Sequence, residues 1–106
     1  MTDVVCIGRN TKEDPLSKAD WESFIREVTS LFTTLYFVGE GIGIYEDKKE
    51  DSYCCVGILT EKDKLSSLAK KYKQECIAYL CGETQFVCSS QREPFLRNRK
   101  KASLKS

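Results

Sequence analysis

The stretch "TLYFVGEGIGIYEDKKEDSYCCVGILT", residues 34–60, decides the fold because it holds two β-rich runs around one charged segment. Aromatic and β-branched residues are frequent in both runs, 34–45 and 52–60, and such residues are typical of strands. The segment between them, "EDKKED" at 46–51, is entirely charged, as expected of a turn region. The stretch therefore predicts a β-hairpin.

Three glycines, Gly39, Gly41 and Gly43, occupy alternate positions in the first run. A dinucleotide-binding loop needs G-x-G-x-x-G between a strand and a helix, and a Walker loop ends in G-K-[ST]; the run satisfies neither pattern. Alternate residues of a strand share one face, so the glycines predict a strip without side chains. We expect either a groove for a helix, a second subunit or a flat ligand, or a bulged edge strand packed against a neighbour.

An amphipathic helix is predicted before the hairpin. In "SKADWESFIREVTSLF", residues 17–32, apolar side chains recur at the spacing of one helical face. Ser17 and Asp20 have the spacing of a capping box, which favours a helix start there. The β-rich "DVVCIGR" at 3–9 precedes this segment and predicts a first strand.

A second helix is predicted after the hairpin. "TEKDKLSSLAKKYKQECIAYL", residues 60–80, opens with capping spacing between Thr60 and Asp63 and places apolar residues on one face. The helical pattern weakens near Glu75, where "CIAYL" is β-like. After a turn at "CGET", the segment "QFVCS" at 85–89 predicts a last short strand.

The resulting order of elements, βαββαβ, predicts a ferredoxin-like α+β sandwich with two helices on one face of an antiparallel sheet. The expected strand order 4-1-3-2 places the glycine-bearing strand on an edge. We predict one domain over residues 1–90 and a separate tail at 91–106. In "SYCCVGIL" both alternating sets of residues are apolar or small, so we expect the sheet face away from the helices to be covered, by a partner subunit in a homodimer or by the tail.

The amino-acid composition argues against a metal centre and against histidine-based catalysis. There are six cysteines but no histidine; Cys76 and Cys81 are five positions apart and Cys54 and Cys55 are adjacent, which favours free thiols over a metal centre, so we expect no metal and no cofactor. Without histidine the chain cannot supply Ser-His or Cys-His nucleophilic catalysis. No spacing pairs two carboxylates for acid–base work, and we therefore predict that the chain is not an enzyme.

The charge distribution separates an acidic body from a basic end. Residues 92–106 carry six Lys or Arg against one Glu, and we expect a solvated tail or, alternatively, an arm that contacts nucleic acid. The basic residues singled out for such a role are Arg92, Arg97, Arg99, Lys100 and Lys101. With no leader and no apolar run near the roughly 20 residues of a membrane span, we expect a cytoplasmic protein without a membrane partner.

Four segments together carry a family resemblance: "GRNT" at 8–11, "GEGIGIY" at 39–45, "EDSY" at 50–53 and "LAKKYKQECIAY" at 68–79. The pattern resembles small uncharacterised proteins of phages and some bacteria that combine an E-S-aromatic strand start with a Y-x-Q-E helix end. The resemblance implies a viral or mobile-element origin and a compact α/β fold. If these proteins share a site, the matching positions are Tyr45, Asp51, Ser52, Gln74 and Glu75.

These observations predict a small non-enzymatic binding protein that acts as a homo-oligomer on a host protein or on a small, nucleotide-like ligand near the glycine strand. The resemblance further implies an inhibitor of host defence, in the cytoplasm of a host cell. The alternative is a structural or virion-associated protein whose basic tail contacts nucleic acid or a capsid neighbour.

Overall fold

The computed structural model describes residues 1–85 and 87–89. These residues form four strands, two α-helices and one short 3₁₀ turn, in the predicted order. The elements are β1 (Thr2–Gly8), α1 (Lys18–Thr29), β2 (Phe32–Tyr45), β3 (Lys48–Leu59), η1 (Lys62–Lys64), α2 (Leu65–Lys71) and β4 (Ala78–Gly82).

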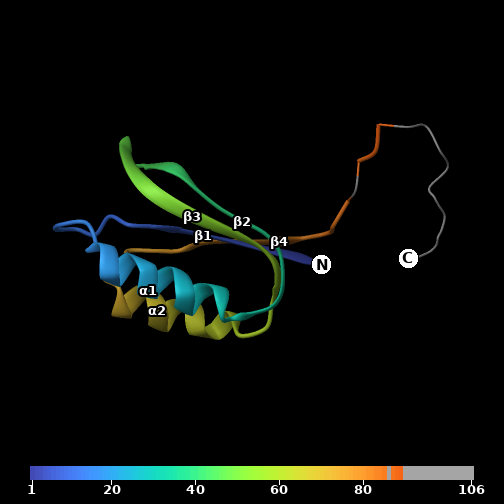
Figure 1. Cartoon of the computed structure of the whole chain (residues 1–106), viewed down its shortest axis with the longest axis horizontal. Helices are drawn as coiled ribbons and strands as arrows, with labels where there is room; N and C mark the ends of the chain where they lie inside the picture. The colour runs from blue at the N-terminus through green and yellow to red at the C-terminus, as the bar shows by residue number, and fades with distance from the viewer. Residues whose placement is uncertain (86, 90–106) are drawn as a thin grey trace.

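The four strands form one antiparallel sheet in the order β2-β3-β1-β4. Both helices lie on one side of this sheet, and the β2–β3 hairpin extends away from them (Figure 1). The predicted α+β sandwich, the strand order and the edge position of the glycine-bearing strand are thus confirmed.

The core lies between the two helices and the helix-facing side of β1 and β3. Helix α1 begins where Ser17 accepts a hydrogen bond from the Asp20 backbone amide at 3.2 Å, as the capping spacing predicted. Phe24 of α1 is fully buried and its ring stacks on Tyr72 with centroids 4.6 Å apart. The buried core side chains are Val5, Ile7, Leu16, Trp21, Phe24, Val28, Leu31, Cys55, Leu65, Leu68 and Tyr72.

The second half of the chain differs from the sequence prediction in two places. Helix α2 begins at Leu65, with no side-chain cap, and ends at Lys71, so the capping box predicted at Thr60 and Asp63 is wrong. The fourth strand uses Ala78–Gly82, which includes most of the β-like "CIAYL" segment, and the strand predicted at 85–89 is wrong for the described residues there. The position of the last strand is determined by tertiary pairing, because residues 78–82 form the antiparallel ladder with the second edge of β1.

The basic tail lies outside the described residues. The structure therefore does not test the predicted boundary at 90/91 or the roles of Arg92, Arg97, Arg99, Lys100 and Lys101. Within residues 1–85 and 87–89, no helix is long and apolar enough to cross a membrane.

One buried carboxylate, that of Asp3 on β1, joins three strands. Its two oxygens accept hydrogen bonds from the Leu59 backbone amide at 2.8 Å and from the Tyr79 hydroxyl at 2.7 Å. These donors lower the pKa of Asp3, the Leu59 amide contributing most. Because the pKa is lower in the folded state, the resulting stabilisation is present above the unfolded pKa of roughly 3.9 and is lost as pH falls through the folded value.

We expect Asp3→Asn to lower the free energy of unfolding at pH 7 by about 1–3 kcal/mol, the scale for hydrogen bonds to a charged group. The loss should shrink as pH falls from about 5 to 2, where the wild-type carboxylate is itself protonated. Urea unfolding followed by circular dichroism across this range measures both effects. The exposed Asp63, substituted as Asp63→Asn, is the matched control, and an equal pH profile for the two variants would contradict the assignment.

Candidate functional site

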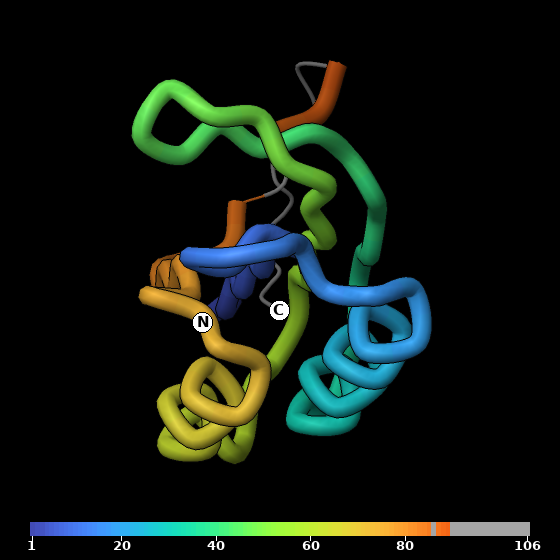
Figure 2. Tube along the Cα trace, turned by 90° about the vertical axis from the view of Figure 1, so that its left-hand side faces the viewer, coloured from blue at the N-terminus to red at the C-terminus, as the bar shows by residue number. Residues whose placement is uncertain are grey.

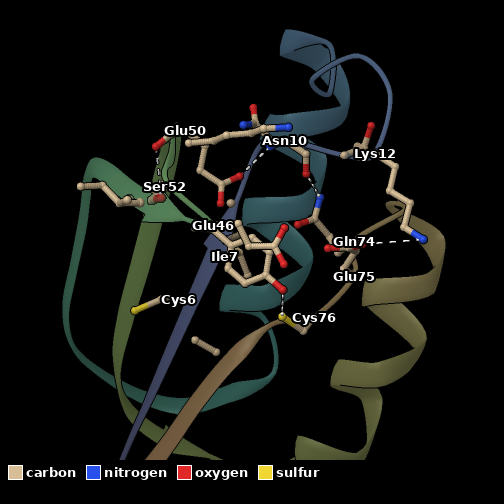
Figure 3. A pocket seen from close by; sticks show the side chains of 17 residues that line it. Cys6, Ile7, Asn10, Lys12, Glu46, Glu50, Ser52, Gln74, Glu75 and Cys76 are labelled. Atoms are coloured by element: carbon tan, nitrogen blue, oxygen red, sulfur yellow. Dashed lines mark hydrogen bonds and ion pairs between the residues drawn. The ribbon is translucent and has the colours of Figure 1, made fainter.

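A cavity of about 590 Å³ lies beneath the end of the β2–β3 hairpin, and we call it the hairpin pocket. Figure 2 shows the hairpin arching on the side of β1 that is opposite to the two helices. Three segments distant in sequence line the pocket: 6–12 from β1 and its following loop, 43–52 from the hairpin, and 74–78 between α2 and β4. Figure 3 shows their side chains converging. The polar lining residues are Asn10, Thr11, Lys12, Tyr45, Glu46, Lys48, Glu50, Ser52, Gln74 and Glu75.

A two-residue turn at Glu46 and Asp47 places the hairpin residues of the pocket. Both residues have positive φ, 50° and 65°, which is the backbone of a type I′ turn. The flanking Tyr45 and Lys48 are therefore directly paired, and β3 already begins at Lys48. Of the charged run predicted as a turn region, only 46–47 form the turn, and 48–51 belong to the strand.

Two glycines are needed where carboxylate and hydroxyl groups approach the sheet. The Glu50 carboxyl group lies over Gly8, so a β-carbon at Gly8 would collide with it. In this position Glu50 accepts a hydrogen bond from the Asn10 backbone amide at 2.8 Å. The Ser52 hydroxyl occupies the space beside Gly43 in the same way. Gly8 and Gly43 thus allow Glu50 and Ser52 to lie flat along the wall of the pocket.

The end of α2 supplies the third wall. Lys73 has a positive φ of 58°. The backbone amide of Gln74 donates to the Ala69 carbonyl at 2.8 Å, and the backbone amide of Lys73 donates to the Lys70 carbonyl at 3.2 Å. This pair of bonds is a Schellman motif, which ends the helix and turns the chain toward β4. The Gln74 side chain then donates to the Asn10 carbonyl at 3.1 Å, which fixes the helix end against the loop after β1.

The hairpin also contacts the start of β4 through Tyr45. The Cys76 thiol donates a hydrogen bond to the Tyr45 hydroxyl, with 3.7 Å between Sγ and Oη. This bond and the electrostatic interactions of the phenol with Cys76 and Glu46 raise the pKa of Tyr45 to about 12. The phenol is therefore neutral over the physiological pH range and offers an aromatic face with a polar tip.

The pocket carries more negative than positive side chains. Glu46, Glu50 and Glu75 line it, against Lys12 and Lys48. Lys12 is paired with Glu75 at 3.7 Å, but both side chains are exposed, so this ion pair contributes little energy. The carboxyl end of α2, where the helix dipole is negative, lies at the same wall.

The structure brings five of the eight predicted ligand-site residues to this pocket. They are Gly43, Tyr45, Ser52, Gln74 and Glu75. The other three, Gly39, Gly41 and Asp51, do not line it. Asp51 forms an ion pair with Arg9 at 3.2 Å, and a β-carbon at Gly39 or Gly41 would meet no described atom within 4 Å. That any of these residues binds a ligand stays a prediction.

Sequence reasoning missed Glu50 and Asn10 as members of the site. Asn10 belongs to the "GRNT" segment of the family resemblance, so a signal for it existed in the sequence. Glu50 belongs to the "EDSY" segment of the same resemblance, but the run of six charged residues predicts a turn there. Its role depends on the close approach to Gly8, which has no local signature.

The six cysteines differ widely in burial. Cys55 is fully buried, Cys6 and Cys54 are half-buried, and Cys76, Cys81 and Cys88 are exposed. All six are free thiols. Cys6 and Cys54 are directly paired across β1 and β3, with 2.6 Å between their sulfur atoms. Among residues 1–85 and 87–89, no group of three His, Cys, Asp or Glu side chains is arranged to hold a metal ion.

No protein-family model and no curated protein matches the chain. Among solved structures, the chain is similar to one described as a phage SAM lyase in the apo state, with 17% sequence identity and a TM-score of 0.43. The match covers 74% of this chain and 75% of the other. The matched protein is phage-related, as are the proteins that the sequence pattern resembles. Membership of a family with an E-S-aromatic strand start and a Y-x-Q-E helix end stays a prediction.

The prediction that the chain is not an enzyme is contradicted by this comparison, because the structure that it resembles is that of a lyase, an enzyme. The sequence argument considered histidine-based nucleophiles and carboxylates paired by spacing. It could not detect carboxylates that converge from distant segments, as Glu50 and Glu75 do in the hairpin pocket. At this TM-score the likeness assigns no reaction and no substrate to the chain.

The reactivity of the cysteine thiols tests the burial of Cys6 in the pocket wall and of Cys55 in the core. Burial is the largest cause that raises the pKa of Cys6 to about 12 and that of Cys55 to about 11. Since the thiolate is the nucleophile, we expect iodoacetamide at pH 8 to alkylate Cys6 and Cys55 at least about tenfold more slowly than the exposed Cys76 and Cys81. Peptide mass spectrometry over a time course measures the order, and equal rates at Cys6 and Cys81 would contradict it.

Proposed function

We propose that the hairpin pocket binds a small nucleoside-like ligand. The observation that supports this proposal is the convergence of an aromatic side chain, amides and carboxylates from three distant segments on one cavity. Its volume of about 590 Å³ lies within the roughly 300–1,000 Å³ of small-molecule sites.

Each component of a nucleoside has a matching group in the pocket. The Tyr45 ring, 44% exposed, provides a stacking face for a base. The carboxylates of Glu50 and Glu75 accept hydrogen bonds from ribose hydroxyl groups, a common role of acidic residues in nucleotide sites. The side chains of Asn10 and Ser52 offer further polar groups for the edge of a base.

The electrostatics favour a nucleoside over a nucleotide with several phosphates. Three carboxylates outnumber two ammonium groups in the pocket, and the helix end beside it is the negative one. A phosphate site would instead present a helix N-terminus or clustered Arg side chains. A ligand with a neutral or positively charged group beyond the ribose fits this field better.

The biological setting comes from the sequence resemblance and not from the pocket. A phage-type protein that binds a small host metabolite removes it from the free pool of the infected cytoplasm. Such removal is one route to the inhibition of a host defence that uses the metabolite.

Calorimetric titration of the full chain with adenosine and with ATP tests the proposal. We expect saturable binding of adenosine and weaker binding of ATP. Tyr45→Ala should weaken adenosine binding at least about tenfold, because stacking on one aromatic ring contributes about 1–3 kcal/mol. Mass spectrometry of the recovered adenosine distinguishes binding from conversion.

Tyr36→Ala is the matched control for this titration. Tyr36 lies on the same strand and is similarly exposed, at 47%, but does not line the pocket. The proposal fails if adenosine gives no saturable heat, or if the two tyrosine variants change its affinity equally.

A further inference from the structure

Strand β2 is apolar on both faces and exposed on both. Its pairing with β3 places Val38, Ile42 and Ile44 on the helix-facing side of the sheet and Phe37 and Tyr45 on the opposite side. Phe37, Ile42 and Ile44 are 73%, 65% and 71% exposed, and the hairpin extends away from the two helices (Figure 1). A strand with two apolar faces is typical of a sheet interior, whereas β2 is an edge strand.

The outer edge of β2 also lacks the usual protection against pairing. Edge strands are normally protected by Lys or Pro residues, by bulges or by short length. Residues 34–45 contain no Lys and no Pro, and their single charged residue is Glu40. The irregularities in register lie between Phe32 and Phe37, and from Phe37 to Tyr45 the pairing with β3 is continuous.

The exposed part of β2 is nearly symmetric about its middle residue. In the segment "FVGEGIGIY", residues 37–45, positions at equal distances on either side of Gly41 carry the same kind of residue: two aromatic, two aliphatic and two glycine residues. The exception is the pair of Glu40 and Ile42. An antiparallel strand pair about a two-fold axis matches each residue with its counterpart on the other side of that axis. The symmetry of the segment is what such self-pairing requires.

We infer that β2 pairs antiparallel with β2 of a second copy of this chain, about a two-fold axis at Gly41. This register matches Phe37 with Tyr45, Val38 with Ile44 and Gly39 with Gly43 of the second copy. Aromatic and aliphatic cross-strand pairs of this kind stabilise a sheet. The two four-stranded sheets become one continuous sheet of eight strands, and the free edge is removed.

Glu40 distinguishes this register from its neighbours. With the axis at Gly41, Glu40 lies opposite Ile42 of the second copy, and the two Glu40 carboxylates are only diagonal neighbours. With the axis at Glu40, the two carboxylates are directly opposite, which is destabilising. Moving the axis to Glu40 also breaks the aromatic pair, because Phe37 then lies opposite Gly43.

Pairing with a second copy explains why residues 39 and 41 are glycines. A β-carbon at Gly39 or Gly41 meets no described atom within 4 Å, so neither glycine is required by the packing of one copy. Across the axis, the glycines of both copies form one strip without side chains, bordered by the Phe37–Tyr45 pairs. This strip is a shared form of the groove expected from the sequence.

Site-specific crosslinking of the full chain tests the register. In Gly41→Cys the new thiol faces its own counterpart across the axis, at a spacing that a disulfide can span. In Gly39→Cys, the matched control, the new thiol faces Gly43 instead. Both positions have open space, so both variants retain the fold. Diamide is the oxidant, and peptide mass spectrometry identifies which positions are linked.

We expect the wild-type chain to show a native mass of twice 12.1 kDa. Gly41→Cys should form a disulfide through position 41 at least about tenfold faster than Gly39→Cys does through position 39. Ile42→Glu should give monomers, because it places a carboxylate opposite Glu40 of each copy. Leu80→Glu, an equally exposed change on the opposite edge strand, should leave the dimer intact. A single-chain native mass, crosslinking at 39 as fast as at 41, or dissociation by Leu80→Glu alone would overturn the inference. None of these readouts depends on ligand binding.

Discussion

The two-residue turn at Glu46–Asp47 is the constraint on which the site depends. A hairpin with a two-residue loop has one register, and the pairing of Tyr45 with Lys48 sets every later pair along β2 and β3. Since side chains alternate between faces, a slip of one residue would move Tyr45, Glu50 and Ser52 to the helix side of the sheet. The pocket therefore depends on two residues held at positive φ, which is unfavourable for Glu.

The overall architecture could be predicted because its signals are periodic. The apolar spacing of 17–32 and the two β-rich runs of 34–60 give the element order, and the handedness of crossovers then gives the sheet order. The boundaries were harder because they depend on single contacts. The chain leaves helix α2 through Lys73, a residue without a strong preference for positive φ, and the last strand is determined by its pairing with β1.

The candidate site was only half predictable for a related reason. The family resemblance predicts Tyr45, Ser52, Gln74 and Glu75 as site residues, and these four line one cavity. Gly39 and Gly41 were selected for the same groove as Gly43, yet only Gly43 has a side-chain neighbour in one copy. Alternation along a strand assigns a residue to a face, but it does not show how far along that face a pocket extends.

The hairpin pocket and the exposed edge belong to the same strand, so the proposed ligand binding and the inferred association involve the same residues. Gly43, Ile44 and Tyr45 line the pocket and also end the segment that pairs across the inferred axis. In one copy alone, this end of the hairpin is held by β3 and by the Tyr45–Cys76 contact, with few buried apolar contacts. Regions of that kind open locally at low cost. Pairing of β2 with a second copy would restrict this opening, because it fixes the outer side of the strand that forms the pocket wall.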